Sequence, residues 1–155
     1  MAAFNLLEPV SPESPCGPDL ERQDDPEFLE YYFEAESRLP ERYFTPGLAA
    51  DGREDRLFDP RSIDLAAETA TITGMLRRSR DLRLLSLLAR FQILAGRLEE
   101  FSVTLEDIAA VMAEWPGELH PSGAERRAAI DSLNNQPTAV MPLLHLSLLP
   151  NSEVT

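Results

Sequence analysis

The sequence contains no lysine, a single cysteine and only two histidines. One cysteine, Cys16, cannot form an intrachain disulfide, which fits a reducing compartment. No apolar run reaches the ~20 residues of a membrane-spanning helix, and residues 1–5 lack the basic and apolar regions of a secretory signal. These absences predict a cytoplasmic protein that does not insert into a membrane.

Positive charge is also scarce. All 14 basic residues are arginine, and they stand against 27 acidic residues, which gives a net charge of −13. Because binding to nucleic-acid phosphates requires clustered cations, this balance excludes nucleic acid as a partner. The one dense basic patch consists of Arg77, Arg78 and Arg80, and we take these three as candidate protein-binding residues.

Apolar residues recur at helical spacing through most of the chain, and no stretch alternates with the period of a strand. The pattern predicts an all-α fold, a single compact domain of about five to six helices. We expect Asp25 to cap the first helix, Gly96 to end the third, and Ser122 with Glu125 to form a capping box at the fifth. The expected helices cover residues 26–39, 60–78 (or from 62), 82–95, 98–115 and 122–133, with a short helix around Pro142.

Three segments are expected to differ from this helical body, which we place at residues 26–150. Prolines in residues 1–25 favour an extended N-terminal arm, whose apolar side chains would pack it on the body. Within the arm, Gly17 suits a tight turn. Residues 40–58 are polar and predict a long mobile loop, a second candidate contact surface. Residues 151–155 are expected to be a disordered tail.

Two apolar helices supply the expected core. In the third helix, leucines after Ser79-Arg80-Asp81-Leu82-Arg83 cover most faces, so Arg83 and Arg90 need partners if they are buried. In the fourth, a seam at alternating three- and four-residue steps predicts helix-on-helix packing through Leu98, Phe101, Leu105, Ile108, Met112 and Trp115.

The Ser79–Arg83 motif admits a structural and a functional interpretation. Asp81 stands where a helix N-terminus favours a carboxylate, and Arg83 can bind carboxylates or backbone carbonyls of another element. We therefore expect Asp81 to cap the helix and Arg83 to clamp helices together. In the alternative, Arg83 or Arg80 contacts a partner protein.

No catalytic constellation emerges from the titratable residues. His120 and His145 lack a second ligand at helical spacing, so neither predicts a metal site, and we expect no cofactor. We expect His120 to bond backbone near Trp115. Prolines and acids around Cys16 disfavour a reactive thiolate.

Three blocks of sequence resemble the N-terminal domain of the ImpA/TssA family, a component of the bacterial type VI secretion system. They are the proline-rich segment 7–20, the helix start 76–83, and Trp115-Pro116-Gly117-Glu118-Leu119-His120-Pro121 followed by an arginine-bearing helix. In the second block Ser79, Asp81 and Arg83 match the family pattern, and Arg80 replaces the common lysine. In the third block the matching residues include Trp115, His120 and Pro121.

The resemblance implies a non-enzymatic, cytoplasmic assembly or scaffold protein that helps organise the baseplate and tail sheath. It implies baseplate, sheath or tube proteins as partners, and self-association mainly through regions beyond this sequence. Two alternatives stay open from the residues. One is a small helical ligand-binding or hydrolase domain that uses His120. The other is a structural dimerisation domain that pairs through the seam or the apolar residues 138–149.

Overall fold

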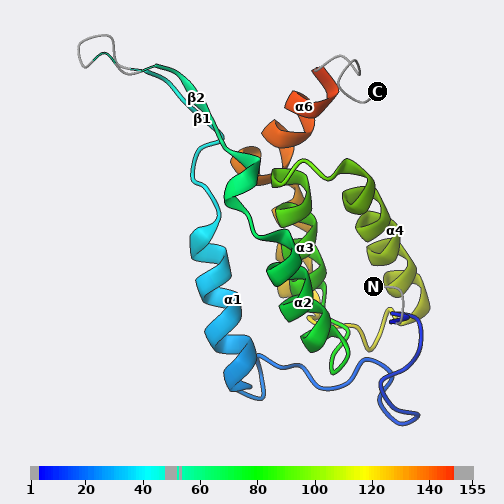
Figure 1. The fold of residues 1–155 in the computed structure, drawn as a ribbon. Coiled ribbons are helices and arrows are strands. Elements are labelled where there is room, and N and C mark those ends of the chain that lie inside the picture. The colour runs from blue at the N-terminus through cyan, green and yellow to red at the C-terminus, as the bar shows by residue number, and fades with distance from the viewer. Residues whose placement is uncertain (1–3, 48–51, 53, 149–155) are drawn as a thin grey trace.

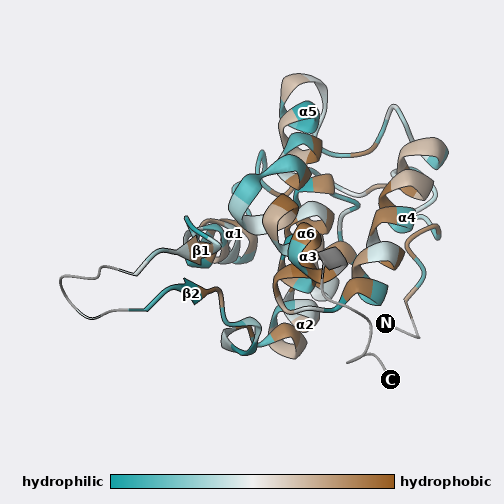
Figure 2. Ribbon diagram, turned by 90° about the horizontal axis from the view of Figure 1, so that it is seen from above, coloured by the Kyte–Doolittle hydropathy of each residue, from teal (hydrophilic) through white to brown (hydrophobic). Residues whose placement is uncertain are grey.

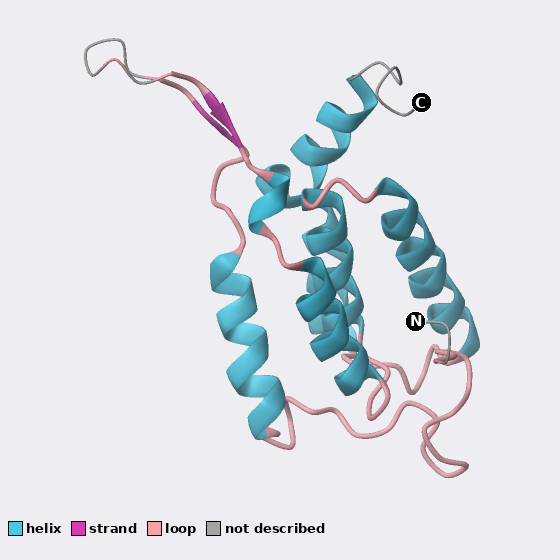
Figure 3. Ribbon diagram, in the orientation of Figure 1, coloured by secondary structure: helices cyan, strands magenta, loops and turns pink. Residues whose placement is uncertain are grey.

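The computed structural model describes residues 4–47, 52 and 54–148. It confirms the all-α prediction, with helices around a central one and a single pair of very short strands in the described part of the chain (Figure 3). The helices are α1 (Pro26–Arg38), α2 (Leu65–Leu76), α3 (Leu82–Leu94), α4 (Leu98–Glu114), α5 (Gly123–Asp131) and α6 (Met141–Leu148). Short helical turns cover Pro60–Ser62, Ser132–Asn134 and Gln136–Val140, and the strands are β1 (Phe44–Thr45) and β2 (Arg56–Leu57).

Aspartates start three of the helices. Asp25 accepts a hydrogen bond from the amide of Phe28 at α1, and Asp64 accepts one from the amide of Ala67 at α2. The second helix therefore begins later than predicted. The Pro60–Ser62 turn is a separate element that precedes it. These side chains satisfy amides that have no partner within the helix.

The predicted capping box at α5 is wrong. Ser122 makes no capping hydrogen bond with its side chain. Gly123, the first residue of α5, has a positive φ of 61°, so the backbone departs from helical geometry where a capping box needs a regular first turn.

Helix α3 lies at the centre of the molecule. All of its residues, from Leu82 to Leu94, are buried. Figure 2, seen from above, shows α1, α2, α4 and α5 around it. Its interior charge has a partner, as the sequence required: the Arg90 guanidinium lies 2.6 Å from the Glu36 carboxylate of α1. The core is thus organised as one buried helix with others packed on it.

The face that α4 turns toward α3 differs from the predicted seam. Phe101 and Ile108 are buried as expected, but Leu98 and Leu105 are 46% and 37% exposed. Thr104 is buried instead, because its hydroxyl donates to the Gln92 amide oxygen of α3 at 2.7 Å. This internal hydrogen bond lets a polar residue occupy the inner face, which hydrophobic spacing alone does not predict.

Residues 40–58 form a β-hairpin in their described part, although no strand was expected there. Phe44 pairs with Leu57 and Thr45 with Arg56 in antiparallel register. Strands of two residues are too short to produce a recognisable alternation. Figure 1 shows the hairpin projecting from the helical body on the same side as α6. The predicted tail, residues 151–155, lies outside the described residues.

The N-terminal arm is extended and packs on the body, as predicted. It passes from the C-terminal end of α4 beneath the helices to α1 (Figure 1). Leu6, Cys16 and Leu20 are buried in the main hydrophobic core. The tight turn is present, with the Gly17 amide donating to the Ser14 carbonyl at 3.1 Å and a Gly17 φ of 68°.

Gly17, the one glycine of the arm, is expected to be sensitive to substitution. A Cβ there would overlap the backbone carbonyl of Arg78, in addition to the strain of a positive φ. Gly17→Ala should therefore lower the free energy of unfolding by more than Gly96→Ala. Gly96 has a φ of 78° but no heavy atom within 4 Å of the added carbon, so it reports the conformational strain alone, about 1–2 kcal/mol. Urea unfolding measures both, and equal losses would contradict the close approach of the arm.

Candidate functional site

The Ser79–Arg83 motif forms the connection between α2 and α3, and it is buried rather than exposed. Ser79 and Asp81 are fully buried, and Arg80 and Arg83 are 3% and 7% exposed. The motif lies between the N-terminal arm on one side and the turn at His120 on the other. We call residues 79–83 the junction.

Arg80 fixes the arm through its guanidinium. Nε donates to the Leu6 carbonyl at 2.8 Å and Nη2 to the Glu8 carbonyl at 2.5 Å, while Nη1 donates to the Leu76 carbonyl at the end of α2. The guanidinium also lies over the Phe4 ring, 5.1 Å from its centroid. Burial lowers the pKa of Arg80 from its ordinary value. A side chain so enclosed holds the chain together and cannot present its charge to a partner, so only Arg77 and Arg78 of the basic patch reach the surface.

Backbone and hydroxyl contacts extend this attachment. The Arg80 amide donates to the Cys16 carbonyl at 2.8 Å, and the Ser79 hydroxyl donates to the Pro18 carbonyl at 2.7 Å. Both acceptors belong to the tight turn of the arm. The junction thus satisfies backbone carbonyls that would otherwise be buried without donors.

Arg83 lies among three carboxylates, and its own helix cap is one of them. Asp81 accepts from the Arg83 amide at 2.8 Å and caps α3, and it also pairs with the Arg83 guanidinium at 2.7 Å. From the arm, Asp19 binds Arg83 at 2.7 Å, and Glu21 forms a further ion pair. Burial opposes the charge of Arg83, but Asp81 and Asp19 outweigh it and raise the pKa. The expected cap is present, but the ion pairs of Arg83 join α3 to the arm and not, as was expected, to another helix.

His120 joins the junction to the turn before α5. Its amide donates to the Arg80 carbonyl at 3.2 Å, and its carbonyl accepts from the Leu82 amide at 2.8 Å. The ring nitrogen Nε2 lies 2.7 Å from the Gly17 carbonyl. A carbonyl can only accept, so Nε2 is the donor. His120 bonds backbone as expected, but its side chain reaches the Gly17 carbonyl of the arm and not the backbone near Trp115.

Arg126 of α5 is a positioning residue that sequence reasoning did not single out. Its Nε and Nη1 donate to the carbonyls of Pro121 and Pro116, each at 2.8 Å, and Nη2 donates to that of Leu119. It therefore holds the turn that follows Trp115, which is itself buried. The sequence did indicate an arginine here, through the arginine-bearing helix after Leu119-His120-Pro121 in the third block. It did not show whether Arg126 or Arg127 was that residue.

The two surface arginines differ in their surroundings. Arg78 pairs with Asp25 at 2.7 Å and with Glu27 at 2.8 Å, both near the start of α1. Arg77 is exposed, and its guanidinium lies 5.0 Å from the centroid of the Phe4 ring. Arg77 is therefore the member of the patch whose charge is most available to a partner.

The reactive side chains named from the sequence do not assemble. Burial raises the pKa of the Cys16 thiol to about 11, and Glu118 adds to the shift, so the thiolate is disfavoured. The His145 ring packs edge-on against the Tyr43 ring, with 5.9 Å between the ring centroids. Its partner is thus on the hairpin, whereas His120 binds the arm. Within the described residues, no three His, Cys, Asp or Glu side chains gather as metal ligands do. In the same residues, none of the helices is both long and apolar enough to cross a membrane.

Removing the Arg80 guanidinium should destabilise the fold strongly. Arg80→Met leaves the carbonyls of Leu6, Glu8 and Leu76 without these donors, at about 1–3 kcal/mol for each buried acceptor left unpaired. Arg77→Met is the control, since it removes an exposed cation over the same ring, worth about 1 kcal/mol at most. Chemical denaturation and limited proteolysis of the arm measure the difference. Similar stability of the two variants would contradict the role of Arg80.

The ion cluster should also make stability fall in acid. Burial alone would raise the pKa of Asp19, but the hydrogen bond and charge of Arg83 outweigh it and hold the pKa below its ordinary value. Asp19 therefore stabilises the fold above the ordinary carboxyl pKa of about 3.9, and this contribution is lost as the pH falls through the lower folded value.

Asp19→Asn should be less stable than the parent at neutral pH, and its stability should depend less on pH in the acid range. Denaturant unfolding at a series of pH values measures this dependence. Asp24→Asn serves as an exposed control. An acid dependence unchanged in Asp19→Asn would show that Arg83 does not depress the pKa of this carboxylate.

Comparison with known proteins gives a family match over most of the chain. Residues 7–135, from the arm through α5 and the turn after it, match the family described as ImpA, N-terminal, type VI secretion system. Searches of curated proteins and of solved structures found no match. The matched range includes the arm, the junction and the turn that Arg126 holds, the same three segments that the hydrogen bonds join. The chain belongs to the ImpA N-terminal family of the type VI secretion system.

Proposed function

We propose that this chain is a non-enzymatic, cytoplasmic assembly component of the type VI secretion system. In this proposal it is a protein-docking domain that helps organise the baseplate and the tail sheath. Family membership supports a role in the secretion machine. The observation that carries the docking role is that the buried polar groups of the junction bind the chain's own backbone and side chains.

That arrangement suits a domain that presents a fixed surface. The arm, the junction and the turn at His120 come from three distant parts of the sequence and are joined by hydrogen bonds and ion pairs. Groups held in this way lose little further conformational entropy when a partner binds, which favours affinity. We infer that the outer surfaces of the helices are the binding surfaces.

The alternative of a hydrolase that uses His120 has less support. Its Nε2 is bound to a backbone carbonyl, and its Nδ1 lies 4.0 Å from Asp19, a carboxylate already engaged by Arg83. A general base needs a free ring nitrogen within reach of a substrate proton. The dimerisation alternative keeps one supporting observation, which is that Leu98 and Leu105 of the predicted seam are exposed.

Binding to secretion subunits tests the docking role. The purified chain should bind at least one purified baseplate or sheath subunit of the same secretion system. Arg77→Glu should weaken that binding, because Arg77 carries the available charge of the basic patch. Arg127→Glu is the matched control, because Arg127 is an exposed arginine on α5. Calorimetry or biolayer interferometry provides the affinities.

The outcomes separate the two parts of this proposal. If no subunit binds, the docking role is wrong. If a subunit binds and both reversals weaken it equally, the contact is a general charge effect, and the basic patch has no special part in it.

A further inference from the structure

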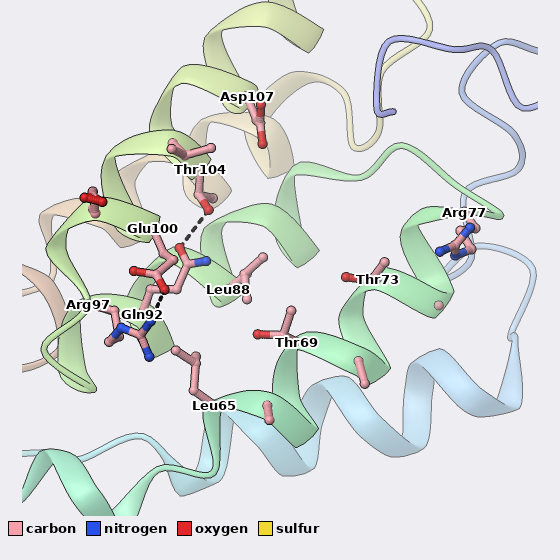
Figure 4. Close-up of a pocket in the computed structure, with 15 residues that line it drawn as sticks. Leu65, Thr69, Thr73, Arg77, Leu88, Gln92, Arg97, Glu100, Thr104 and Asp107 are labelled. Atoms are coloured by element: carbon pink, nitrogen blue, oxygen red, sulfur yellow. Dashed lines mark hydrogen bonds and ion pairs between the residues drawn. The ribbon is translucent and has the colours of Figure 1, made fainter. Parts of the chain in front are cut away.

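Helices α2 and α4 both pack on α3 but leave an open groove between their outer parts (Figure 4). The groove has a volume of about 890 Å³. Leu88 and Gln92 of α3 form its floor, and the two helices form its walls. Along α2 it extends from Leu65 to Arg77, which at 1.5 Å per residue is about 18 Å. A groove of this length accommodates about three turns of another helix.

The α2 wall is built of small side chains. Ala66, Ala70 and Gly74 recur every four residues and are all exposed, with Thr69 and Thr73 beside them. Rows of residues four apart form the ridges and grooves through which helices pack. Small residues along such a row let the axis of a second helix approach closely. The buried residues of α2 lie only in its C-terminal half, so its N-terminal half has room for another packing partner.

The floor holds a buried polar group that is not fully paired. Gln92 is 6% exposed, and its amide oxygen accepts from the Thr104 hydroxyl. Within the described residues its amide nitrogen has no hydrogen-bond partner, and Figure 4 shows it directed into the space between α2 and α4. Ser86 Oγ, and not this nitrogen, is the buried side-chain atom without a partner in the described residues, so the Gln92 nitrogen is accessible from the groove. A hydrogen-bond acceptor on a molecule in the groove could bind the Gln92 amide nitrogen.

The α4 wall is acidic. Glu99 and Asp107 both line the groove, and neither forms an ion pair with another described residue, whereas Glu100 pairs with Arg97. Burial raises the pKa of Asp107, and its neighbour Glu106 adds to the effect. The two unpaired carboxylates are eight residues, or about 12 Å, apart on α4, with the exposed Val103 between them.

We propose that this groove binds an amphipathic helix of another secretion protein. The bound helix would place small or apolar residues against α2 and Val103. It would carry two basic residues about two turns apart against Glu99 and Asp107, an acidic residue against Arg77 beside the C-terminal end of α2, and a side-chain acceptor for Gln92. This inference rests on the proposed docking function and assigns it a surface and a partner chemistry.

Length and charge favour this occupant over others. A compact ligand would fill only part of a groove that follows three turns of α2. A second copy of the chain carries a net charge of −13 and so matches an acidic wall poorly. A basic amphipathic helix satisfies the small-residue row, the carboxylates and the amide together.

Paired tryptophan substitutions on α2 test the groove. Ala70→Trp fills it, whereas Ala67→Trp places the same side chain on the same helix at an exposed position that does not line it. Ala70→Trp should weaken binding of the captured baseplate or sheath subunit about tenfold or more. Ala67→Trp should leave the affinity unchanged. Thermal unfolding of both variants establishes that they are folded.

Charge reversal on α4 provides the second test. Glu99→Lys with Asp107→Lys should weaken binding and reduce its salt dependence. Glu106→Lys with Glu114→Lys changes the same net charge at exposed positions of α4 outside the groove and should do neither. Synthetic peptides covering the predicted helices of the captured subunit should then identify one basic amphipathic segment that competes for binding.

The results distinguish this inference from the docking role itself. If a subunit binds and Ala70→Trp has no more effect than Ala67→Trp, the groove is not the binding site, although the docking role stands. If Ala70→Trp alters only self-association in light scattering, the groove belongs to a second copy and the inference is overturned. If no subunit binds the parent chain, both proposals fail.

Discussion

The fold depends on the buried guanidinium of Arg80. It binds the carbonyls of Leu6 and Glu8 in the arm and of Leu76 in α2, so one side chain joins two segments some seventy residues apart in the sequence. Arginine suits this position because its donors diverge from a rigid plane, whereas a lysine ammonium concentrates its donors on one atom. The arm needs such donors because its prolines keep it out of helices and strands, where carbonyls find partners within the element.

Arg83 and Arg126 also hold segments of the chain in place with one guanidinium each, but they bind different acceptors. Arg83 binds carboxylates of the arm and of its own cap, and Arg126 binds three carbonyls in the turn after α4. Each arginine therefore fixes a segment that has irregular backbone. This explains why a chain poor in basic residues still buries Arg80 and Arg83.

Local signals predicted the elements well, and distant contacts escaped prediction. The Asp25 and Asp81 caps are encoded within a few residues of sequence, and so is the buried character of α3. The hydrogen bond from His120 to Gly17 depends on a chain reversal that no local pattern records. The burial of Arg80 was missed for the same reason. Its neighbours Arg77 and Arg78 made it part of an apparent surface patch, and the sequence does not show that the arm covers it.

The groove between α2 and α4 also results from contacts between helices that the local sequence does not record. Apolar spacing suggested that α4 buries Leu98 and Leu105, but the bond between Thr104 and Gln92 sets a different inner face. That bond leaves Val103 exposed beside the groove and uses only the oxygen of the Gln92 amide. The C-terminal end of α2 is meanwhile held by Arg80, so the small-residue row cannot shift to close the gap. A fixed helix facing a second helix across an incompletely paired floor is an arrangement that a third helix can complete.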